Sequence, residues 1–111
     1  MTIDELVKPT VAWQERMEEG DDLFTPENLQ ATNEVLDRFI QQLKNLGEDS
    51  SEQAKTECVK HVVLQLNEVN ETYEFFIETM EREELCEFIE AAASVVGMNW
   101  EEDRTEEWRE W

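Results

Sequence analysis

The chain has 111 residues, enough for one domain with a single modest core, and this length excludes a large multi-domain enzyme. It is 40% hydrophobic with only three glycines and two prolines, which favours a folded helical domain over a disordered tail or a turn-rich β protein. The 29 acidic and 9 basic residues give a net charge of −20, a field that repels phosphates and anionic membranes and attracts basic proteins. We therefore expect neither direct nucleic-acid binding nor membrane binding.

The first predicted helix begins near residues 8–10, because Pro9 is tolerated in a first helical turn but not further inside a helix. It carries Val11, Trp13 and Met17. The Gly-Asp-Asp sequence at residues 20–22 predicts a break after it.

The second predicted helix has the strongest start signal in the chain. Thr25 can cap its first turn, Pro26 suits its first position and Glu27 favours the positive end of the helix dipole. Its apolar face recurs at helical spacing and consists of Leu29, Leu36, Phe39, Ile40, Leu43 and Leu46. We expect this helix to end at Gly47, which suits a left-handed C-cap.

The third predicted helix is unusually long. Ser50 and Gln53 have the spacing of a capping box, and no glycine or proline interrupts residues 51–96. The pattern therefore predicts a helix from about Ser51 to about Met80, with a bend near residues 81–84. At 100° per residue, its inward face gathers Ala54, Cys58, Val62, Gln65, Val69, Tyr73, Phe76, Ile77 and Met80.

A new apolar phase predicts a further helix that ends at Gly97. Its apolar residues are Leu85, Phe88, Ile89, Ala92, Val95 and Val96. Asn99 with Glu102 is another capping signature, so WEEDRTEEWREW is expected to open as a short helix. Short connections and the lack of strand alternation predict an all-α fold, a small antiparallel helical bundle of four to five helices with one long central helix, as a single domain over residues 1–111.

The last twelve residues hold three of the four tryptophans. Chain ends fray unless they are docked, so the simplest interpretation is that Trp100 and Trp108 pin this segment onto the bundle. Alternatively, Trp100, Trp108 and Trp111 form an exposed aromatic patch and a second contact surface.

The patterns of enzymes and metal sites are missing from the sequence. A di-iron bundle needs paired Glu-x-x-His motifs, whereas the sole histidine, His61, follows Cys58 by three positions. A zinc site from Cys58, His61, Cys86 and one acid lacks a Cys-x-x-Cys pair, and EEGDDLFTPENL lacks the order of an EF-hand loop. A Cys-His nucleophile pair would need positive surroundings. We expect no enzyme activity, no cofactor and no dedicated metal site, and a metal-binding bundle is kept as a third functional candidate.

Two cysteines, Cys58 and Cys86, are too few for a disulfide scaffold, and we expect both to be reduced, packed thiols. The N-terminal sequence MTIDELVKPTVAW has no basic region followed by an apolar run, and no segment approaches the roughly 20 apolar residues of a membrane helix. The expected location is therefore the cytoplasm.

An acidic ridge is predicted on the outer side of the long helix. Residues 70–90 hold eight glutamates and one arginine. On a helical wheel, Glu71, Glu74, Glu78 and Glu81 lie opposite the apolar face and form this ridge. Two apolar side chains, Leu64 and Phe75, also project away from that face, and an aromatic ringed by carboxylates is typical of an interface anchor with a charged rim. The alternative is that a neighbouring helix buries Phe75. The candidate partner-binding residues are Leu64, Glu68, Glu71, Glu74, Phe75, Glu78 and Glu81.

The C-terminal half resembles a family of short acidic proteins. The stretch from EFIEAAASVVGMNW to EEWREW, with LNEVNETYEFF before it, is similar to an uncharacterised family of short acidic, all-helical bacterial proteins. In that family a helix closes at a glycine, and a capped acidic segment follows and ends in an acid and a tryptophan. The resemblance implies an all-helical fold and a bacterial-type context.

The leading functional hypothesis is a non-enzymatic binding protein that neutralises or regulates a basic protein partner, as an immunity protein or a nucleic-acid mimic does. Residues 51–111 carry 17 acids and 5 bases, so −12 of the −20 charge lies in the half that contains Leu64 and Phe75. The alternative is a structural module that self-associates as a homodimer through apolar residues off the inward face, with the charge serving solubility.

Overall fold

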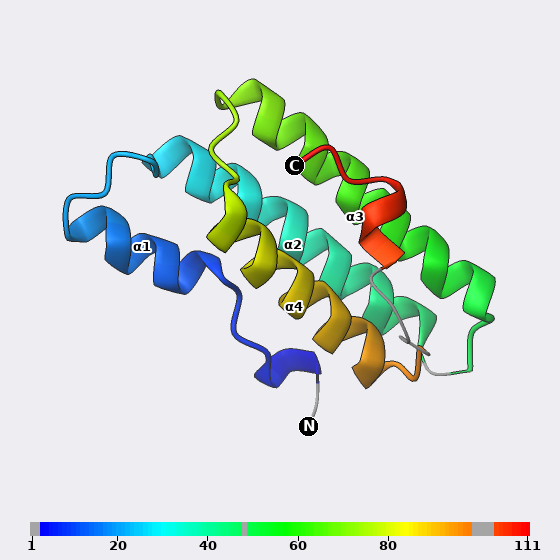
Figure 1. Ribbon diagram of the computed structural model, residues 1–111. Helices are drawn as coiled ribbons and strands as arrows, with labels where there is room; N and C mark the ends of the chain where they lie inside the picture. The colour runs from blue at the N-terminus through cyan, green and yellow to red at the C-terminus, as the bar shows by residue number, and fades with distance from the viewer. Residues whose placement is uncertain (1–2, 48, 99–103) are drawn as a thin grey trace.

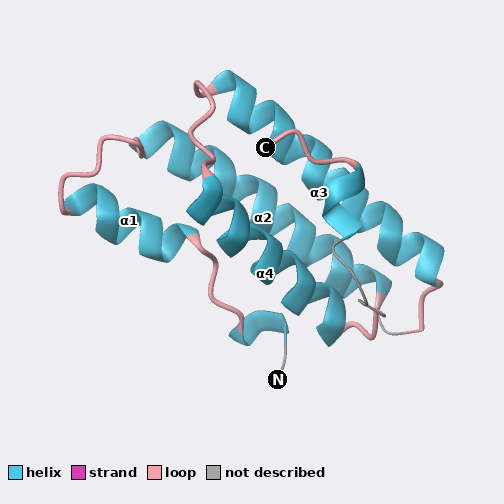
Figure 2. Ribbon diagram, in the orientation of Figure 1, coloured by secondary structure: helices cyan, strands magenta, loops and turns pink. Residues whose placement is uncertain are grey.

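The computed structural model describes residues 3–47, 49–98 and 104–111, and these residues form an antiparallel helical bundle (Figures 1 and 2). Its elements in chain order are η1 (Ile3–Glu5), α1 (Thr10–Glu18), α2 (Pro26–Leu46), α3 (Glu52–Thr72), α4 (Thr79–Val95) and η2 (Arg104–Glu107). No strand occurs in these three described ranges. The predicted all-α bundle is confirmed.

The core lies around α2, which contacts each of the other three helices and packs most extensively against α3. The largest fully buried side chains are Trp13, Leu36, Phe39, Leu43, Leu66, Leu85 and Ile89. The Trp13 ring anchors α1 in this core, because it stacks on Phe24 with centroids 5.3 Å apart and forms a T-shaped pair with Phe76 with centroids 6.1 Å apart. Val11, which shares α1 with Trp13, is exposed instead.

The predicted signals of α2 are confirmed. The Thr25 hydroxyl accepts a hydrogen bond from the Asn28 backbone N–H at 3.1 Å, and the Asn28 side-chain oxygen accepts one from the Thr25 N–H at 3.0 Å. Pro26 occupies the first helical position, and Gly47 closes the helix with a φ of 72°. The heptad leucines Leu29, Leu36 and Leu43 are buried.

The start of α3 lies one residue later than predicted. The N-cap is Ser51, whose hydroxyl accepts from the Ala54 N–H at 3.1 Å. The hydroxyl of Ser50 donates instead to the Leu46 carbonyl, so it extends the end of α2. The predicted capping box of Ser50 with Gln53 is therefore wrong, because two adjacent serines compete for the same role and the loop geometry selects the second.

The predicted extension of α3 to Met80 is wrong, because the helix ends at Thr72 and the chain reverses over residues 73–78. Glu74 and Phe75 have φ angles of 64° and 61°, in the left-handed region. The Phe75 N–H donates to the Asn70 carbonyl at 2.7 Å, and the Asn70 side-chain oxygen accepts from the Ile77 N–H at 2.9 Å. Glu74 follows the C-cap Tyr73 and takes the position where glycine is usual, and the buried Asn70 holds the loop through these hydrogen bonds.

The inward face of α3 is also rotated from the predicted one. Its buried residues are Lys55, Val59, Val62, Val63, Leu66, Asn67 and Asn70. Of the predicted face, Cys58, Gln65 and Val69 are only half-buried, and Met80, now in the first turn of α4, is 57% exposed. The reason is that α3 packs against α2, α4 and the C-terminal segment together, which shifts the buried arc.

Replacing Glu74 by glycine should raise the free energy of unfolding. A non-glycine residue in the left-handed region costs about 1–2 kcal/mol, and the greater chain entropy of glycine offsets part of the gain, so we expect a net increase of about 0.5–1 kcal/mol. Urea denaturation measures it. The control is Glu71→Gly inside the last turn of α3, which should lower the free energy of unfolding by about 1 kcal/mol. Destabilisation by both changes would contradict the left-handed C-terminus.

Candidate functional site

Two loops distant in sequence lie together at one end of the bundle, where the α1–α2 loop faces the α3–α4 loop (Figure 1). We call this region the acidic end. Its exposed acids are Glu18, Glu19, Asp21, Asp22, Glu71, Glu74 and Glu78. Sequence reasoning missed the contribution of the α1–α2 loop, because residues 18–22 carry no signal of which loop they face. The acids of the predicted ridge therefore do not follow one helix, because α3 ends at Thr72, and those at the acidic end come from two loops and the end of α3.

Phe75 is the exposed aromatic of the acidic end. Its side chain is 65% exposed, whereas the next two residues, Phe76 and Ile77, are 2% and 6% exposed. The buried Phe76 and Ile77 side chains and the hydrogen bonds of Asn70 fix the loop. The fixed loop directs the Phe75 ring to solvent. The alternative in which a neighbouring helix buries Phe75 is wrong.

The other predicted contact residues divide into two sets. Leu64, Glu68 and Glu71 lie on one exposed face of α3, with Leu64 42% exposed. Glu74 and Glu78 are exposed in the α3–α4 loop, where Glu78 is the N-cap of α4. All five, together with Phe75, are accessible to a partner.

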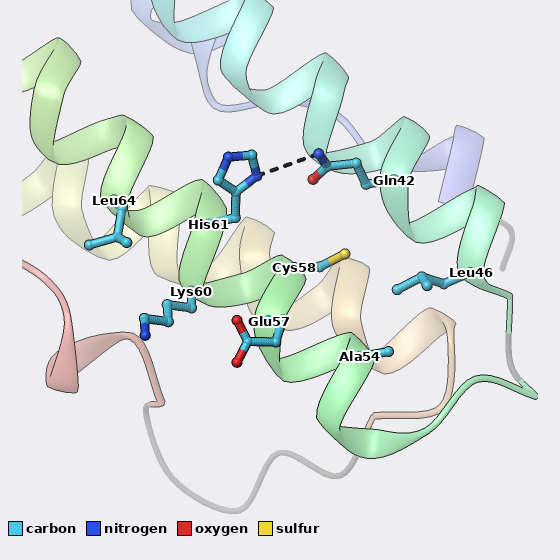
Figure 3. A pocket seen from close by; sticks show the side chains of 8 residues that line it. All are labelled: Gln42, Leu46, Ala54, Glu57, Cys58, Lys60, His61 and Leu64. Carbon is cyan, nitrogen blue, oxygen red and sulfur yellow. Dashed lines mark hydrogen bonds between the residues drawn. The ribbon is translucent and has the colours of Figure 1, made fainter.

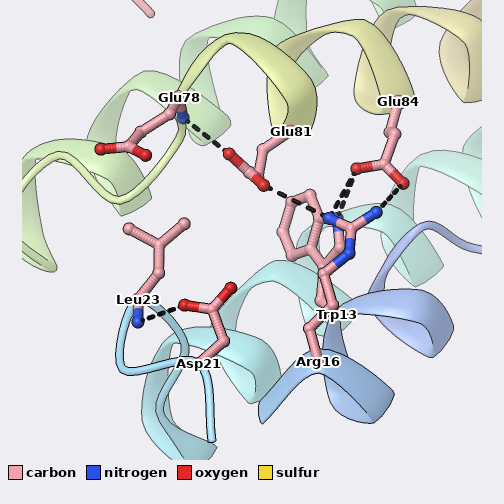
Figure 4. A network of polar contacts seen from close by, with 7 residues as sticks. All are labelled: Trp13, Arg16, Asp21, Leu23, Glu78, Glu81 and Glu84. Atoms are coloured by element: carbon pink, nitrogen blue, oxygen red, sulfur yellow. Dashed lines mark hydrogen bonds and ion pairs between the residues drawn. The ribbon is translucent and has the colours of Figure 1, made fainter. Parts of the chain in front are cut away.

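Glu81 does not belong to the exposed set, and its prediction as a surface contact is wrong. It is 5% exposed, because the break after α3 turns the first turn of α4 toward α1. One of its carboxylate oxygens accepts from the Glu78 N–H at 3.2 Å, and the other lies 3.3 Å from the Arg16 guanidinium. The side chain therefore caps α4 and joins it to α1 (Figure 4).

Arg16 forms the centre of this internal network (Figure 4). Its guanidinium binds the Glu84 carboxylate through two contacts, at 3.0 and 2.8 Å, and the Trp13 indole N–H donates to the same carboxylate at 3.2 Å. The hydrogen bonding that Arg16 donates to the Glu84 carboxylate raises the pKa of Arg16 above its ordinary value. The network joins α1 to α4 and holds the α1–α2 loop beside the α3–α4 loop.

Two clefts border the α3–α4 loop. The smaller one, the Tyr73 cleft, has a volume of about 390 Å³ and is lined by Asp22, Leu23, Thr25, Asn28, Thr72, Tyr73, Glu74 and Phe76. The larger one, of about 710 Å³, is lined by Arg16, Asp21, Leu23, Ile77, Glu78, Thr79, Met80, Glu81 and Arg82. Leu23 lines both clefts, so the two hollows adjoin at this side chain.

The C-terminal segment docks on α3 through Asn67. The side-chain amide of this buried residue donates to the Trp108 carbonyl at 2.9 Å and accepts from the Glu110 N–H at 3.0 Å. Trp108 and Trp111 are half-buried against the core, and the Arg109 guanidinium lies 5.5 Å from the Trp111 ring centroid. For these two tryptophans the structure favours docking over an exposed patch, and Trp100 lies outside the described residues.

The sequence candidates Cys58 and His61 line a groove of about 380 Å³ between α2 and α3, together with Leu46, Ala54 and Leu64 (Figure 3). His61 is exposed, and its ring nitrogen lies 3.4 Å from the Gln42 amide nitrogen. Burial raises the pKa of the Cys58 thiol, which favours its neutral, unreactive form at neutral pH.

The zinc site considered from the sequence is not assembled. Cys86 lies 3.5 Å from the Thr105 hydroxyl, and the described residues contain no group of three or more His, Cys, Asp or Glu side chains placed to hold a metal ion. The same three ranges contain no helix long and apolar enough to cross a membrane.

The fold and the site define a small all-α bundle with an acidic end that carries one exposed aromatic ring. Comparisons with protein-family models, with curated proteins and with solved structures give no significant match to the chain. The resemblance of the C-terminal half to a family of short acidic bacterial proteins therefore stays a prediction.

Proposed function

We propose that this chain is a non-enzymatic binding protein that neutralises or regulates a basic protein partner through its acidic end, in the manner of an immunity protein or a nucleic-acid mimic. The observation that carries the proposal is Phe75, 65% exposed between the exposed acids Glu74 and Glu78. Aromatic anchors with charged rims are the usual energetic centres of protein interfaces.

The backbone at Phe75 supports a role for its ring. A φ of 61° is unfavourable for a phenylalanine and easy for a glycine. Residues held in such conformations are concentrated at binding and catalytic sites, where the surrounding structure supplies the stability. A strained residue that also exposes a large apolar ring points to a contact made by that ring.

The charge distribution supports a basic partner. The acidic end has seven exposed acids and two nearby arginines, Arg16 and Arg82. Arg16 is already paired with Glu84. The net field is therefore negative where Phe75 is presented, and it should steer a basic protein to this end and raise its association rate.

Affinity capture with a matched variant pair tests the proposal. The tagged chain is incubated with an extract of its native host, bound proteins are eluted with rising salt, and the recovered partner is purified for a binary Kd. We expect a basic protein that elutes with salt. Phe75→Gly, which suits the backbone, should weaken its binding by about 30-fold or more, while Val7→Ser, which removes another exposed apolar side chain, should not change it.

A charge reversal adds a second comparison. Glu71→Lys should weaken the same complex and reduce its salt dependence more than Glu90→Lys on the exposed side of α4. The proposal fails if the chain captures no basic protein. It also fails if the captured protein binds the double variant Phe75→Gly/Glu71→Lys as tightly as it binds the wild type.

The second candidate function is a structural homodimer, and the α2–α3 groove favours it. The groove combines Leu46, Ala54 and Leu64 with Lys60 and a single acid, Glu57, so its own lining adds little to the repulsion between two negatively charged copies. Sedimentation of the purified chain over a range of concentrations discriminates, because a strict monomer excludes this function.

A further inference from the structure

The Tyr73 cleft is lined by residues from two elements that the fold brings together. Asp22 and Leu23 come from the α1–α2 loop, and Tyr73 and Glu74 from the end of α3. Asn28 closes the wall at the start of α2. Its amide is held within the wall, because it donates to the Leu23 carbonyl at 3.2 Å and accepts from the Thr25 N–H at 3.0 Å. The cleft is therefore preformed.

The chemistry of the lining suits a flat cation. Two exposed carboxylates, Asp22 and Glu74, line the cleft, and none of its eight described lining residues is basic. The half-buried Tyr73 supplies the accessible aromatic surface, since Phe76 at the base of the cleft is only 2% exposed. The negative end of the α3 dipole also borders the cleft, and the positive end of α2 on the other side is offset by Glu27 and the Thr25 cap. A guanidinium can stack on an aromatic ring and bind a carboxylate through two N–H groups, whereas an ammonium ion cannot form that paired arrangement.

The chain already holds its own arginines in this way. The Arg16 guanidinium binds the Glu84 carboxylate through two contacts, and the Arg109 guanidinium lies over the Trp111 ring. Carboxylate and aromatic surface are both present in the Tyr73 cleft without an internal arginine to occupy them.

We infer that the Tyr73 cleft binds an arginine side chain of the basic partner, with the guanidinium against Tyr73 and hydrogen-bonded by Asp22 and Glu74, and that lysine binds less well. This inference rests on the proposed function and adds the chemical identity of the contact. Phe75, which follows Glu74 directly, then packs against the partner beside the bound arginine.

Two peptides of equal length and charge test the inference. Fluorescein-labelled hexa-arginine and hexa-lysine are titrated with the purified chain at low and at physiological salt, and binding is followed by fluorescence anisotropy. We expect hexa-arginine to bind about tenfold more tightly than hexa-lysine at both salt concentrations. Tyr73→Leu should remove this preference, and Tyr73→Phe should keep it.

Charge-matched variants locate the contact. The double variant Asp22→Asn/Glu74→Gln should weaken hexa-arginine binding more than the double variant Glu87→Gln/Glu90→Gln. Both variants remove two negative charges, but Glu87 and Glu90 are exposed acids on α4, away from the cleft. Circular dichroism melting confirms that each variant is folded, and the Asp22 and Glu74 side chains are exposed enough to be changed without loss of the core.

The possible results separate this inference from the proposed function. Equal affinity for the two peptides, or a preference that survives Tyr73→Leu and the Asp22 and Glu74 changes, overturns the arginine cleft and leaves the capture of a basic partner through Phe75 intact. Failure of both peptides to bind at low salt also overturns the cleft. The proposed function itself stands or falls with the capture experiment on Phe75→Gly.

Discussion

Replacing Arg16 by methionine should lower the free energy of unfolding by about 2–4 kcal/mol, because the change leaves a buried carboxylate without its cation. Arg16 contacts both Glu81 and Glu84, and the Glu81 side chain is only 6% exposed. Methionine keeps most of the aliphatic part of the side chain, so the loss of stability comes mainly from the guanidinium contacts and little from packing. Urea denaturation at neutral pH measures the change.

A surface ion pair provides the matched control for Arg16. Lys8 lies 2.6 Å from Asp37, whose side chain is 62% exposed, and Lys8→Met should cost less than about 1 kcal/mol because water screens this pair. Arg16→Lys should fall between the two, since lysine keeps the charge and loses the two-contact geometry. If Arg16→Met costs no more than Lys8→Met, the network contributes no more than a surface pair and does not join α1 to α4.

Replacing Asn67 by alanine should release the C-terminal segment and lower the free energy of unfolding by about 2–3 kcal/mol, because two buried hydrogen bonds are lost together. The Asn67 amide bonds the backbone at Trp108 and at Glu110, and no other residue can replace both contacts in that geometry. Limited proteolysis with mass spectrometry should show early cleavage within residues 104–111, and tryptophan fluorescence should shift to the red as Trp108 and Trp111 become exposed.

Asn45 supplies the control for this change. It is exposed on α2 and accepts a hydrogen bond from the Gln41 amide at 3.1 Å, so Asn45→Ala should change the free energy of unfolding by less than about 0.5 kcal/mol. Asn67→Asp should fall between wild type and alanine, because it keeps the acceptor for the Glu110 N–H and loses the donor to Trp108. A C-terminal segment that stays protected in Asn67→Ala would mean that the tryptophans alone hold it.

The ends of α2 could be predicted because their signals are local. Thr25 and Pro26 act within one helical turn, and Gly47 adopts its left-handed angle without help from distant residues. The end of α3 could not be predicted in this way. No glycine or proline lies near Thr72, and the helix ends because Asn70 hydrogen-bonds the loop while Phe76 and Ile77 are drawn into the core. Burial of these two side chains in the core outweighs continuation of the helix, and a helical pattern does not report burial.

The candidate site was predicted only in part, because helical periodicity does not report where a helix ends. Phe75, which the periodicity directed away from the core, lies in the loop after α3 and is exposed because of the fold of that loop. The periodicity identified Leu64 and Glu68 as residues directed away from the core, and both are exposed. It also placed Glu81 on the surface, because a continued helix would carry it there. The break after Thr72 changes its direction, and Arg16, 65 residues earlier in the chain, pairs with it.

By itself, the sequence determined the helical class, the apolar face of α2 and the strongly negative charge, because composition and local periodicity act over a few turns of chain. Only the tertiary structure decided that the α1–α2 and α3–α4 loops meet, that Glu81 is buried and that Phe75 faces solvent. Periodicity describes the direction of a side chain around a helix axis, but the packing of other elements decides where that axis ends and what covers each side.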